Sequence, residues 1–163
     1  MNEASYDIEL GTLIMKYKDD ILYNLSITDK RKLENNEKNK FTDKVYKEIQ
    51  EYMKGQRKTF DIKYKFEGTE FQKKVWKVLE TIPYGKVLTY LEVAKIINNR
   101  KAVRAVGGAC HRNPIWLIVP CHRVVGSNGK LTGYAGGLDM KQKLLEIENK
   151  NKDVPPMLKK RKI

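Results

Sequence analysis

Cysteine and histidine are scarce in this chain of 163 residues, which contains two of each. So few thiols exclude a small secreted scaffold that is held together by disulfides. The four residues form two Cys-His-Arg triplets, at 110–112 and 121–123. Neighbouring side chains in a strand point to opposite faces, so a Cys-His pair rarely brings both groups to one ion. We therefore expect no metal site and, among reduced intracellular thiols, no disulfide between Cys110 and Cys121.

Long apolar runs and targeting signals are also missing. No stretch approaches the roughly 18 apolar residues that indicate a membrane span. The first ten residues, MNEASYDIEL, contain neither the basic nor the apolar region of a signal peptide. We expect an intracellular protein with no membrane partner, cytoplasmic in a prokaryote or nuclear in a eukaryote.

Acidic residues are outnumbered, with 20 Asp and Glu against 33 Lys and Arg, a net charge of +13. Residues 1–60 hold 12 basic and 11 acidic residues, whereas residues 61–163 hold 21 and 9. A local positive excess favours a polyanionic partner, most simply nucleic acid. A solubilising surface with a basic tail explains the excess equally well, so charge alone leaves both interpretations open.

Residues 1–66 are expected to form a scaffold domain of mixed α and β structure. Two β-prone runs between Tyr6 and Thr28, separated by Asp19 and Asp20, predict a hairpin or meander. Residues 41–53 repeat apolar side chains at helical spacing, with a cap at Thr42 or near Asn39. Residues 60–66 alternate and predict a strand or an extended linker. This portion lacks Cys and His, so no nucleophile–base pair is expected in it.

Residues 67–150 are expected to form a second, mainly helical domain, followed by a basic, disordered tail at 151–163. Thr69 and Thr89 are predicted N-caps, and the helices after Thr89 and at 101–111 are joined by a short polar turn, as in a helix-turn-helix. The second of these helices combines Arg104 with very small residues. It either approaches a nucleic-acid groove closely or uses Ala and Gly as spacers in the core. A last helix is predicted at 138–148.

The apolar run at 115–119 is predicted to be a buried strand that Pro120 ends, because proline has no N–H for the ladder. Cys121 would then lie at a rigid strand end, placed for chemistry. A free thiol is only a few per cent ionised at neutral pH, so it needs a base, and His122 is adjacent. Helical spacing from Leu144 allows Glu148 to point inward and orient that base. The fold class is thus α+β, with a small N-terminal antiparallel sheet and helix, then a helical domain carrying the helix-turn-helix and the cysteine strand.

Several sequence blocks resemble one family in order and spacing. They are GTEFQ (68–72), IPYGKVLTY (82–90), RAVGGA (104–109), NP (113–114), PCHRV (120–124) and GYAGG (133–137). From residue 68 to 148 the chain resembles the O6-alkylguanine-DNA alkyltransferases, also called methylated-DNA–protein-cysteine methyltransferases. Residues 1–66 match only in general layout.

The resemblance implies a single-turnover transfer of the alkyl group from guanine O6 in duplex DNA to Cys121, without a cofactor, by a monomer. His122 would act through a water as the base, with Glu148 completing the relay. Asn113 would hold the turn that carries the site. Tyr90 would hydrogen-bond a ring nitrogen of the leaving guanine and help to rotate the nucleotide.

The resemblance also implies how DNA is held. Arg104 would fill the duplex where the base is flipped out, and Ala102 would let its helix sit in the minor groove. The other predicted DNA contacts are Thr89, Tyr90, Arg112 and Ser127. The predicted substrate pocket is lined by Trp116, Val124, Tyr134, Ala135 and Gly136.

Departures from the family concern the pocket and the first domain. Trp116 stands where many members have proline, and it would narrow the alkyl pocket. Ala135 replaces a serine found in some members. Residues 1–66 lack the Cys and His ligands that give some members a structural zinc.

Three other interpretations fit parts of the pattern. A non-catalytic DNA-binding relative would lack the acceptor cysteine, which this chain has. An unrelated thiol hydrolase using Cys121, His122 and Glu148 would leave the basic helix-turn-helix unexplained. A basic DNA-binding regulator would leave the relay residues unexplained.

Overall fold

The computed structural model describes residues 1–29, 31–130, 134 and 136–155. The chain begins with an antiparallel meander of β1 (Asn2–Ile8), β2 (Gly11–Lys18) and β3 (Ile21–Thr28), paired in that order. Asp19 and Asp20, between β2 and β3, both have positive φ, at 51° and 60°. Two such residues form the tight turn that matches the twist of a hairpin. The meander is confirmed; the two predicted runs are β2 and β3, and β1, most of which lies before Tyr6, is an additional strand that was not predicted.

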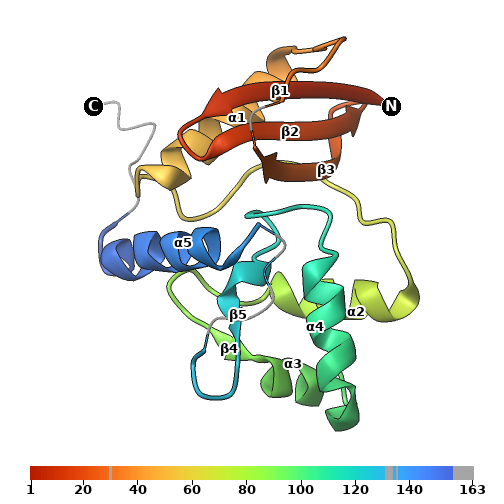
Figure 1. The fold of residues 1–163 in the computed structure, drawn as a ribbon, viewed down its shortest axis with the longest axis vertical. Coiled ribbons are helices and arrows are strands. Elements are labelled where there is room, and N and C mark those ends of the chain that lie inside the picture. Colours follow the sequence, from red (N-terminus) through yellow and green to blue (C-terminus); the bar gives the residue numbers. More distant parts are fainter. Residues whose placement is uncertain (30, 131–133, 135, 156–163) are drawn as a thin grey trace.

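Helix α1 (Lys40–Met53) packs on this sheet (Figure 1). Asn39 and Thr42 cap it reciprocally, each side chain accepting a hydrogen bond from the other's backbone N–H. Its buried face includes Ile49 and Tyr52. Gly55, which follows the helix end, has a φ of 74°, a left-handed conformation that favours glycine.

The segment at 60–66 is an extended linker. It lies between α1 and the next helix in the chain and passes beside β3 (Figure 1). It pairs with β3 at one point, where Leu22 N donates to Lys63 O and Lys65 N donates to Leu22 O. The linker alternative is therefore confirmed.

The remaining elements are α2 (Glu70–Leu79), β4 (Leu88–Thr89), α3 (Tyr90–Ile96), the 3₁₀ turn η1 (Arg100–Ala102), α4 (Val103–His111), the 3₁₀ turn η2 (Cys121–Arg123), β5 (Val124–Val125) and α5 (Leu138–Asn151). Thr69 and Thr89 form capping boxes at the starts of α2 and α3, as predicted. Helix α5 lies between the sheet layer and α2 to α4 (Figure 1). It continues to Asn151, beyond the predicted end at Glu148. Within the described ranges, no helix is long and apolar enough to cross a membrane.

The predicted strand at 115–119 is wrong. Ile115 makes a single bridge to β3, after which the chain turns, with Val119 N donating to Ile115 O at 3.0 Å. Leu117 has a φ of 71°, which a strand does not allow. Ile115, Leu117 and Val119 are all buried. A short apolar run indicates that the segment is buried, but it does not indicate that the segment pairs with another strand. The pattern alone therefore does not distinguish a strand from a buried turn. Cys121 accordingly begins η2 and does not end a strand.

Candidate functional site

Cys121 is held by two neighbouring structures. After η2, Val124 and Val125 pair in parallel with Leu88 and Thr89, which places the cysteine close to the start of α3. Before it, the buried Asn113 side chain closes the turn, donating from Nδ2 to Val119 O at 2.7 Å and accepting from Ile115 N at 3.0 Å. The position of Cys121 is therefore fixed by hydrogen bonds on both sides of it in the chain.

The thiol of Cys121 needs a base to react. Burial raises the pKa of Cys121 to about 11, although a hydrogen bond from Asn113 and the charge of Lys141 act to lower it. Only 3% of the residue is exposed. At neutral pH the sulfur is protonated, and only the thiolate is strongly nucleophilic.

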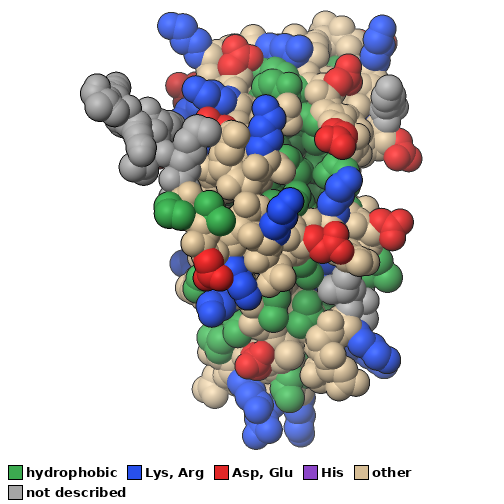
Figure 2. Space-filling view, turned by 90° about the vertical axis from the view of Figure 1, so that its left-hand side faces the viewer, with side chains coloured by type: hydrophobic (Ala, Val, Ile, Leu, Met, Phe, Trp, Pro, Cys, Tyr) green, Lys and Arg blue, Asp and Glu red, His purple; other side chains and the backbone are tan. Residues whose placement is uncertain are grey.

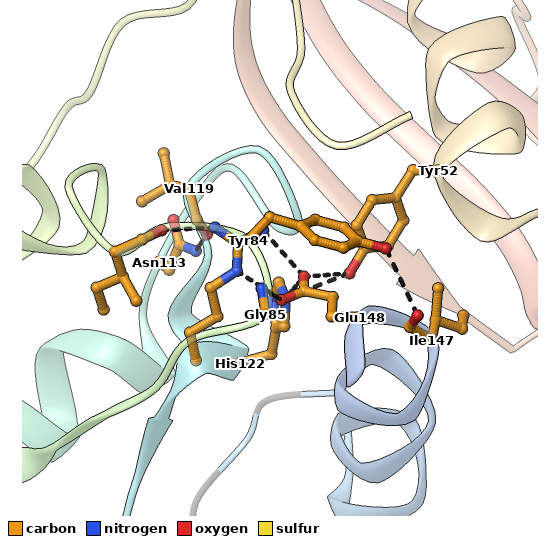
Figure 3. A network of polar contacts seen from close by, with 10 residues as sticks. Tyr52, Tyr84, Gly85, Asn113, Val119, His122, Ile147 and Glu148 are labelled. Atoms are coloured by element: carbon orange, nitrogen blue, oxygen red, sulfur yellow. Dashed lines mark hydrogen bonds and ion pairs between the residues drawn. The ribbon is translucent and has the colours of Figure 1, made fainter. Parts of the chain in front are cut away.

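The adjacent base is completely buried. His122 Nε2 lies 2.7 Å from Glu148 Oε2, and neither side chain is exposed by more than 1% (Figure 3). A carboxylate is acceptor-only, so Nε2 carries the hydrogen and Nδ1 has the free lone pair. Nδ1 is buried and has no hydrogen-bond partner among the residues described. Burial lowers the pKa of His122 below 6.5, so the imidazole is neutral and able to accept a proton.

Glu148 is surrounded by donors from distant parts of the chain (Figure 3). Arg123 makes a two-point contact, from Nε to Oε1 at 2.8 Å and from Nη2 to Oε2 at 2.9 Å. Gly85 N donates to Oε1 at 3.2 Å, and the hydroxyl of Tyr52 donates to Oε2 at 2.6 Å. Burial by itself raises the pKa of Glu148, but the bonds and charges of His122 and Arg123 outweigh it and lower the pKa to about 2. The carboxylate therefore stays ionised and orients the histidine without taking its proton.

An aromatic wall stands beside the cysteine. The rings of Trp116 and Tyr134 are 5.6 Å apart, and a Cβ on Gly136 would come within 3.0 Å of both. The hydroxyl of Tyr134 is buried without a partner in the described part of the chain. Burial first, then the nearby Cys121, raises the pKa of Tyr134. Three of the predicted pocket residues, Trp116, Tyr134 and Gly136, thus lie together, with Tyr134 near enough to Cys121 for its pKa to be raised by the thiol, and Val124 begins β5 after the turn that carries Cys121. Ala135 lies outside the described residues.

Tyr90 is the first residue of α3 and faces α5. Lys141 Nζ donates to its hydroxyl at 3.3 Å. Only 1% of Lys141 is exposed, and burial lowers the pKa of Lys141. Its charge reaches both Cys110 and Cys121. Lys141 thus bonds the tyrosine hydroxyl and lies close enough to Cys121 for their charges to interact.

The outer face of α4 carries a basic side chain among very small residues. Arg104, Ala105 and Gly108 are exposed, and a Cβ on Gly108 would meet no atom within 4 Å. Val106 and Ala109 face the core. Ala109 is therefore an inward spacer, as one alternative predicted, while Ala105 and Gly108 leave the outer surface of α4 low; the approach to a nucleic-acid groove stays a prediction. Figure 2 shows Lys and Arg side chains projecting at the lower end of the molecule, where Figure 1 places α3 and the start of α4.

The other predicted DNA contacts lie on the same half of the chain. Ala102 is half-buried in η1, and Arg112 is exposed at the end of α4. Thr89 is half-buried, and its hydroxyl accepts from Glu92 N at 3.0 Å. Ser127 is exposed in the turn after β5.

The two triplets differ sharply in their surroundings. Cys110 is buried, and burial raises its pKa to about 12, while His111 and Arg112 are exposed. Unlike Cys121, it has an exposed histidine as its neighbour. Both cysteines are free, and no cluster of His, Cys, Asp and Glu fit for a metal occurs within the described segments.

Sequence reasoning missed three residues of this site. Arg123 was read only as part of a motif. Lys141 lies seven positions before Glu148, so helical spacing could have placed both on one face. Tyr52 falls within the apolar repeat of residues 41–53, and the need of a buried tyrosine hydroxyl for a partner is the signal that could have found it.

Comparison with known proteins gives a consistent result. Residues 70–150 match the family described as 6-O-methylguanine DNA methyltransferase, DNA binding domain. The methylated-DNA–protein-cysteine methyltransferase of Methanosarcina acetivorans is 56% identical over 112 residues, 69% of this chain and 72% of that protein. The one from Mycolicibacterium paratuberculosis is 42% identical over 89% of this chain and 90% of that protein. The crystal structure of Mycobacterium tuberculosis OGT in complex with DNA superposes with a TM-score of 0.82, at 38% identity, covering 93% of this chain and 94% of that one.

Proposed function

Because the chain belongs to the methylated-DNA–protein-cysteine methyltransferase family, we propose that Cys121 is the residue that takes the alkyl group from O6-alkylguanine in duplex DNA. The protein is a DNA-repair methyltransferase that acts by direct reversal, and DNA is its partner. One observation carries the assignment of Cys121. It is a buried, protonated thiol beside a neutral histidine whose other nitrogen is held by an ionised carboxylate.

The proposed reaction uses this arrangement directly. The thiol proton passes through a water to His122 Nδ1, while sulfur attacks the alkyl carbon. The new S–C bond forms as the C–O6 bond breaks, and the electron pair remains on the guanine. The proton that His122 took from the thiol then returns through water to the departing guanine, whose ring nitrogen accepts a hydrogen bond from Tyr90. Lys141 supports this role, because a cation on the phenol oxygen makes its hydrogen a stronger donor.

The product is a thioether, which nothing in this reaction reverses. Each molecule therefore reacts once and is inactivated, and no cofactor is needed. Since His122 gains a proton beside an ionised Glu148, the charge that develops on the ring is balanced within the buried site.

The target atom lies inside a duplex, so the nucleotide must be flipped out at a cost of a few kcal/mol. We assign α4 to the minor groove, with Ala102 at its start, and Arg104 to the gap that the base leaves. A side chain inserted into the stack offsets part of that cost. Thr89, Arg112 and Ser127 are proposed to contact the DNA backbone. The positive excess of residues 61–163 supplies affinity that does not depend on sequence.

The flipped base is proposed to enter the pocket formed by Trp116, Val124, Tyr134, Ala135 and Gly136. We divide the chain into a scaffold at 1–66, a DNA-binding and acceptor domain at 67–150, and a basic tail at 151–163, whose residues from 156 lie outside the described structure. The protein is proposed to act as a monomer wherever the chromosome lies, in the cytoplasm of a prokaryote or the nucleus of a eukaryote.

Intact-mass measurement after incubation with duplex DNA carrying O6-methylguanine tests the proposal. We expect one methyl per protein molecule, mapped to Cys121 and absent in Cys121→Ala. Cys110→Ala is the matched control, since it removes the other buried thiol and should still gain one methyl. Repeated turnover would favour a thiol hydrolase, and tight binding without a mass change would favour a non-catalytic DNA-binding protein.

A further inference from the structure

Tyr52 belongs to the N-terminal part of the chain, yet its hydroxyl lies inside the catalytic relay. It is separated from His122 by 70 residues and from Glu148 by 96. The side chain is completely buried near the end of α1. Its hydroxyl is 2.6 Å from Glu148 Oε2 and 3.3 Å from His122 Nε2 (Figure 3). Resting on the relay proposed above, we propose that Tyr52 is a positioning residue that sets the basicity of His122 for alkyl transfer.

The direction of each hydrogen bond follows from the chemistry of the groups. Glu148 is ionised and can only accept, so the Tyr52 hydroxyl donates to Oε2. Burial and the nearby Glu148 raise the pKa of Tyr52, so the phenol keeps that hydrogen. His122 Nε2–H also points to Oε2, at 2.7 Å, and the phenol oxygen lies close enough to receive a minor share of it. Tyr52 and His122 therefore compete, together with Arg123 Nη2, for one carboxylate oxygen, and the charges of Arg123 and Lys141 also act to lower the pKa of His122.

This competition has a definite consequence for the base. A carboxylate oxygen that is shared with another donor is a weaker acceptor for Nε2–H. It stabilises the protonated imidazole less, so it keeps the pKa of His122 low. A histidine that stays neutral at neutral pH is available at Nδ1 to receive the thiol proton. The ring of Tyr52 also stands nearly perpendicular to His122, at 69°, which limits rotation of the imidazole.

The same contact joins the two halves of the protein through the site. Helix α1 carries Tyr52, and α5 carries Glu148. The N-terminal part, expected from sequence to be only a scaffold, thus contributes a group to the chemistry. Because the phenol ring can remain in place when only its hydroxyl is removed, Tyr52→Phe separates this role from packing.

The test compares Tyr52→Phe with Tyr6→Phe. The Tyr6 hydroxyl also donates to a carboxylate on α1, Asp43 Oδ1, at the same distance of 2.6 Å, but has no contact with the relay. First-order rates of methyl transfer are measured under saturating protein from pH 5 to 9, with DNA affinity measured separately. For Tyr52→Phe we expect the acid limb of the profile to move up by about half a pH unit, which slows transfer by about threefold on that limb and by less at pH 7. Affinity should not change, and Tyr6→Phe should match the wild type.

A nitrogen NMR titration provides a second readout. The chain has two histidines, so His111→Gln leaves one imidazole to follow. The titration of His122 should move to higher pH in Tyr52→Phe and stay in place in Tyr6→Phe. An unchanged profile and titration overturn the inference, and so does a loss of rate that is equal at every pH. If His122→Gln also transfers at the wild-type rate, the relay itself is wrong. If His122→Gln slows transfer but Tyr52→Phe changes neither the pH profile nor the His122 titration, the proposed relay is supported and only the inference about Tyr52 is wrong.

Discussion

At the scale of single residues, the site is defined by environments more than by residue types. Cys110 and Cys121 are both buried thiols followed by His and Arg. At Cys110 the histidine is exposed, whereas at Cys121 it is buried against an ionised carboxylate. The same triplet therefore has a base in one place and none in the other, because His111 points to solvent and His122 into the molecule.

Trp116 leads to a prediction about the size of the alkyl group. Its ring packs against Tyr134 and over Gly136, and the charge of Cys121 reaches Tyr134. Trp116→Ala opens this wall, while its backbone N–H can still donate to Leu25 O. We expect reaction with free O6-benzylguanine to accelerate by about tenfold, a typical effect of pocket size, and methyl transfer from DNA to change much less. Intact-mass kinetics with both substrates measures this.

Gly136→Ala is the opposing variant, because its Cβ would come within 2.9 Å of Tyr134 and of Met140. It should slow the benzyl reaction. Equal effects of Trp116→Ala on both substrates would show that Trp116 does not limit the pocket.

At the scale of elements, α4 presents its small residues outward as well as inward. A Cβ on Gly108 meets no atom of the protein, whereas glycine in a helix costs roughly 0.5–1 kcal/mol relative to alanine. We infer that close approach to DNA outweighs this cost. Gly108→Gln should keep or raise the melting temperature and weaken duplex binding by about tenfold, or about 1.4 kcal/mol. Thermal unfolding and fluorescence anisotropy check the two effects.

Asn128→Gln is the matched control. Asn128 is exposed in a turn outside α4, and the variant places the same polar side chain there. If Gly108→Gln unfolds the protein, the glycine is a core spacer. If it binds duplex as well as the wild type, α4 does not approach the groove closely.

At the scale of the whole molecule, the relay makes stability depend on pH. The pKa of His122 is lowered by burial from 6.5, so below pH 6.5 the unfolded chain takes up a proton that the folded chain does not. Glu148 has a pKa of about 2 when folded against 4.5 for a free side chain, so its stabilisation is complete above pH 4.5 and is lost as the pH falls toward 2. Stability should therefore decline progressively as the pH falls from 6.5 to 2.

Urea unfolding at a series of pH values measures this decline. His122→Gln, which cannot titrate, should flatten the slope between pH 6.5 and 5 and reduce the lower part less, because Arg123 still lowers the pKa of Glu148. An identical slope in the variant would mean that His122 is not buried as a neutral group.

The parts of the fold that local rules govern were accessible from sequence. The caps at Thr69 and Thr89 act within three residues, and the apolar repeat of α1 is a property of one helix. Cys121, His122 and Glu148 were also found from sequence, two of them as neighbours and the third by helical spacing and family resemblance. Each of these predictions used groups close in sequence or a pattern already tied to a function.

Sequence by itself thus determined the helices, the meander, the family and the residues next to Cys121 in the chain. Only the tertiary structure decided that 115–119 is a buried turn, because burial of an apolar run does not specify whether the run pairs with a strand. It alone brought Tyr52, Arg123 and Gly85 to one carboxylate. Packing of the elements determines which groups that are far apart in sequence become hydrogen-bond partners. No local pattern of residues indicates which buried hydroxyl will bond to which carboxylate.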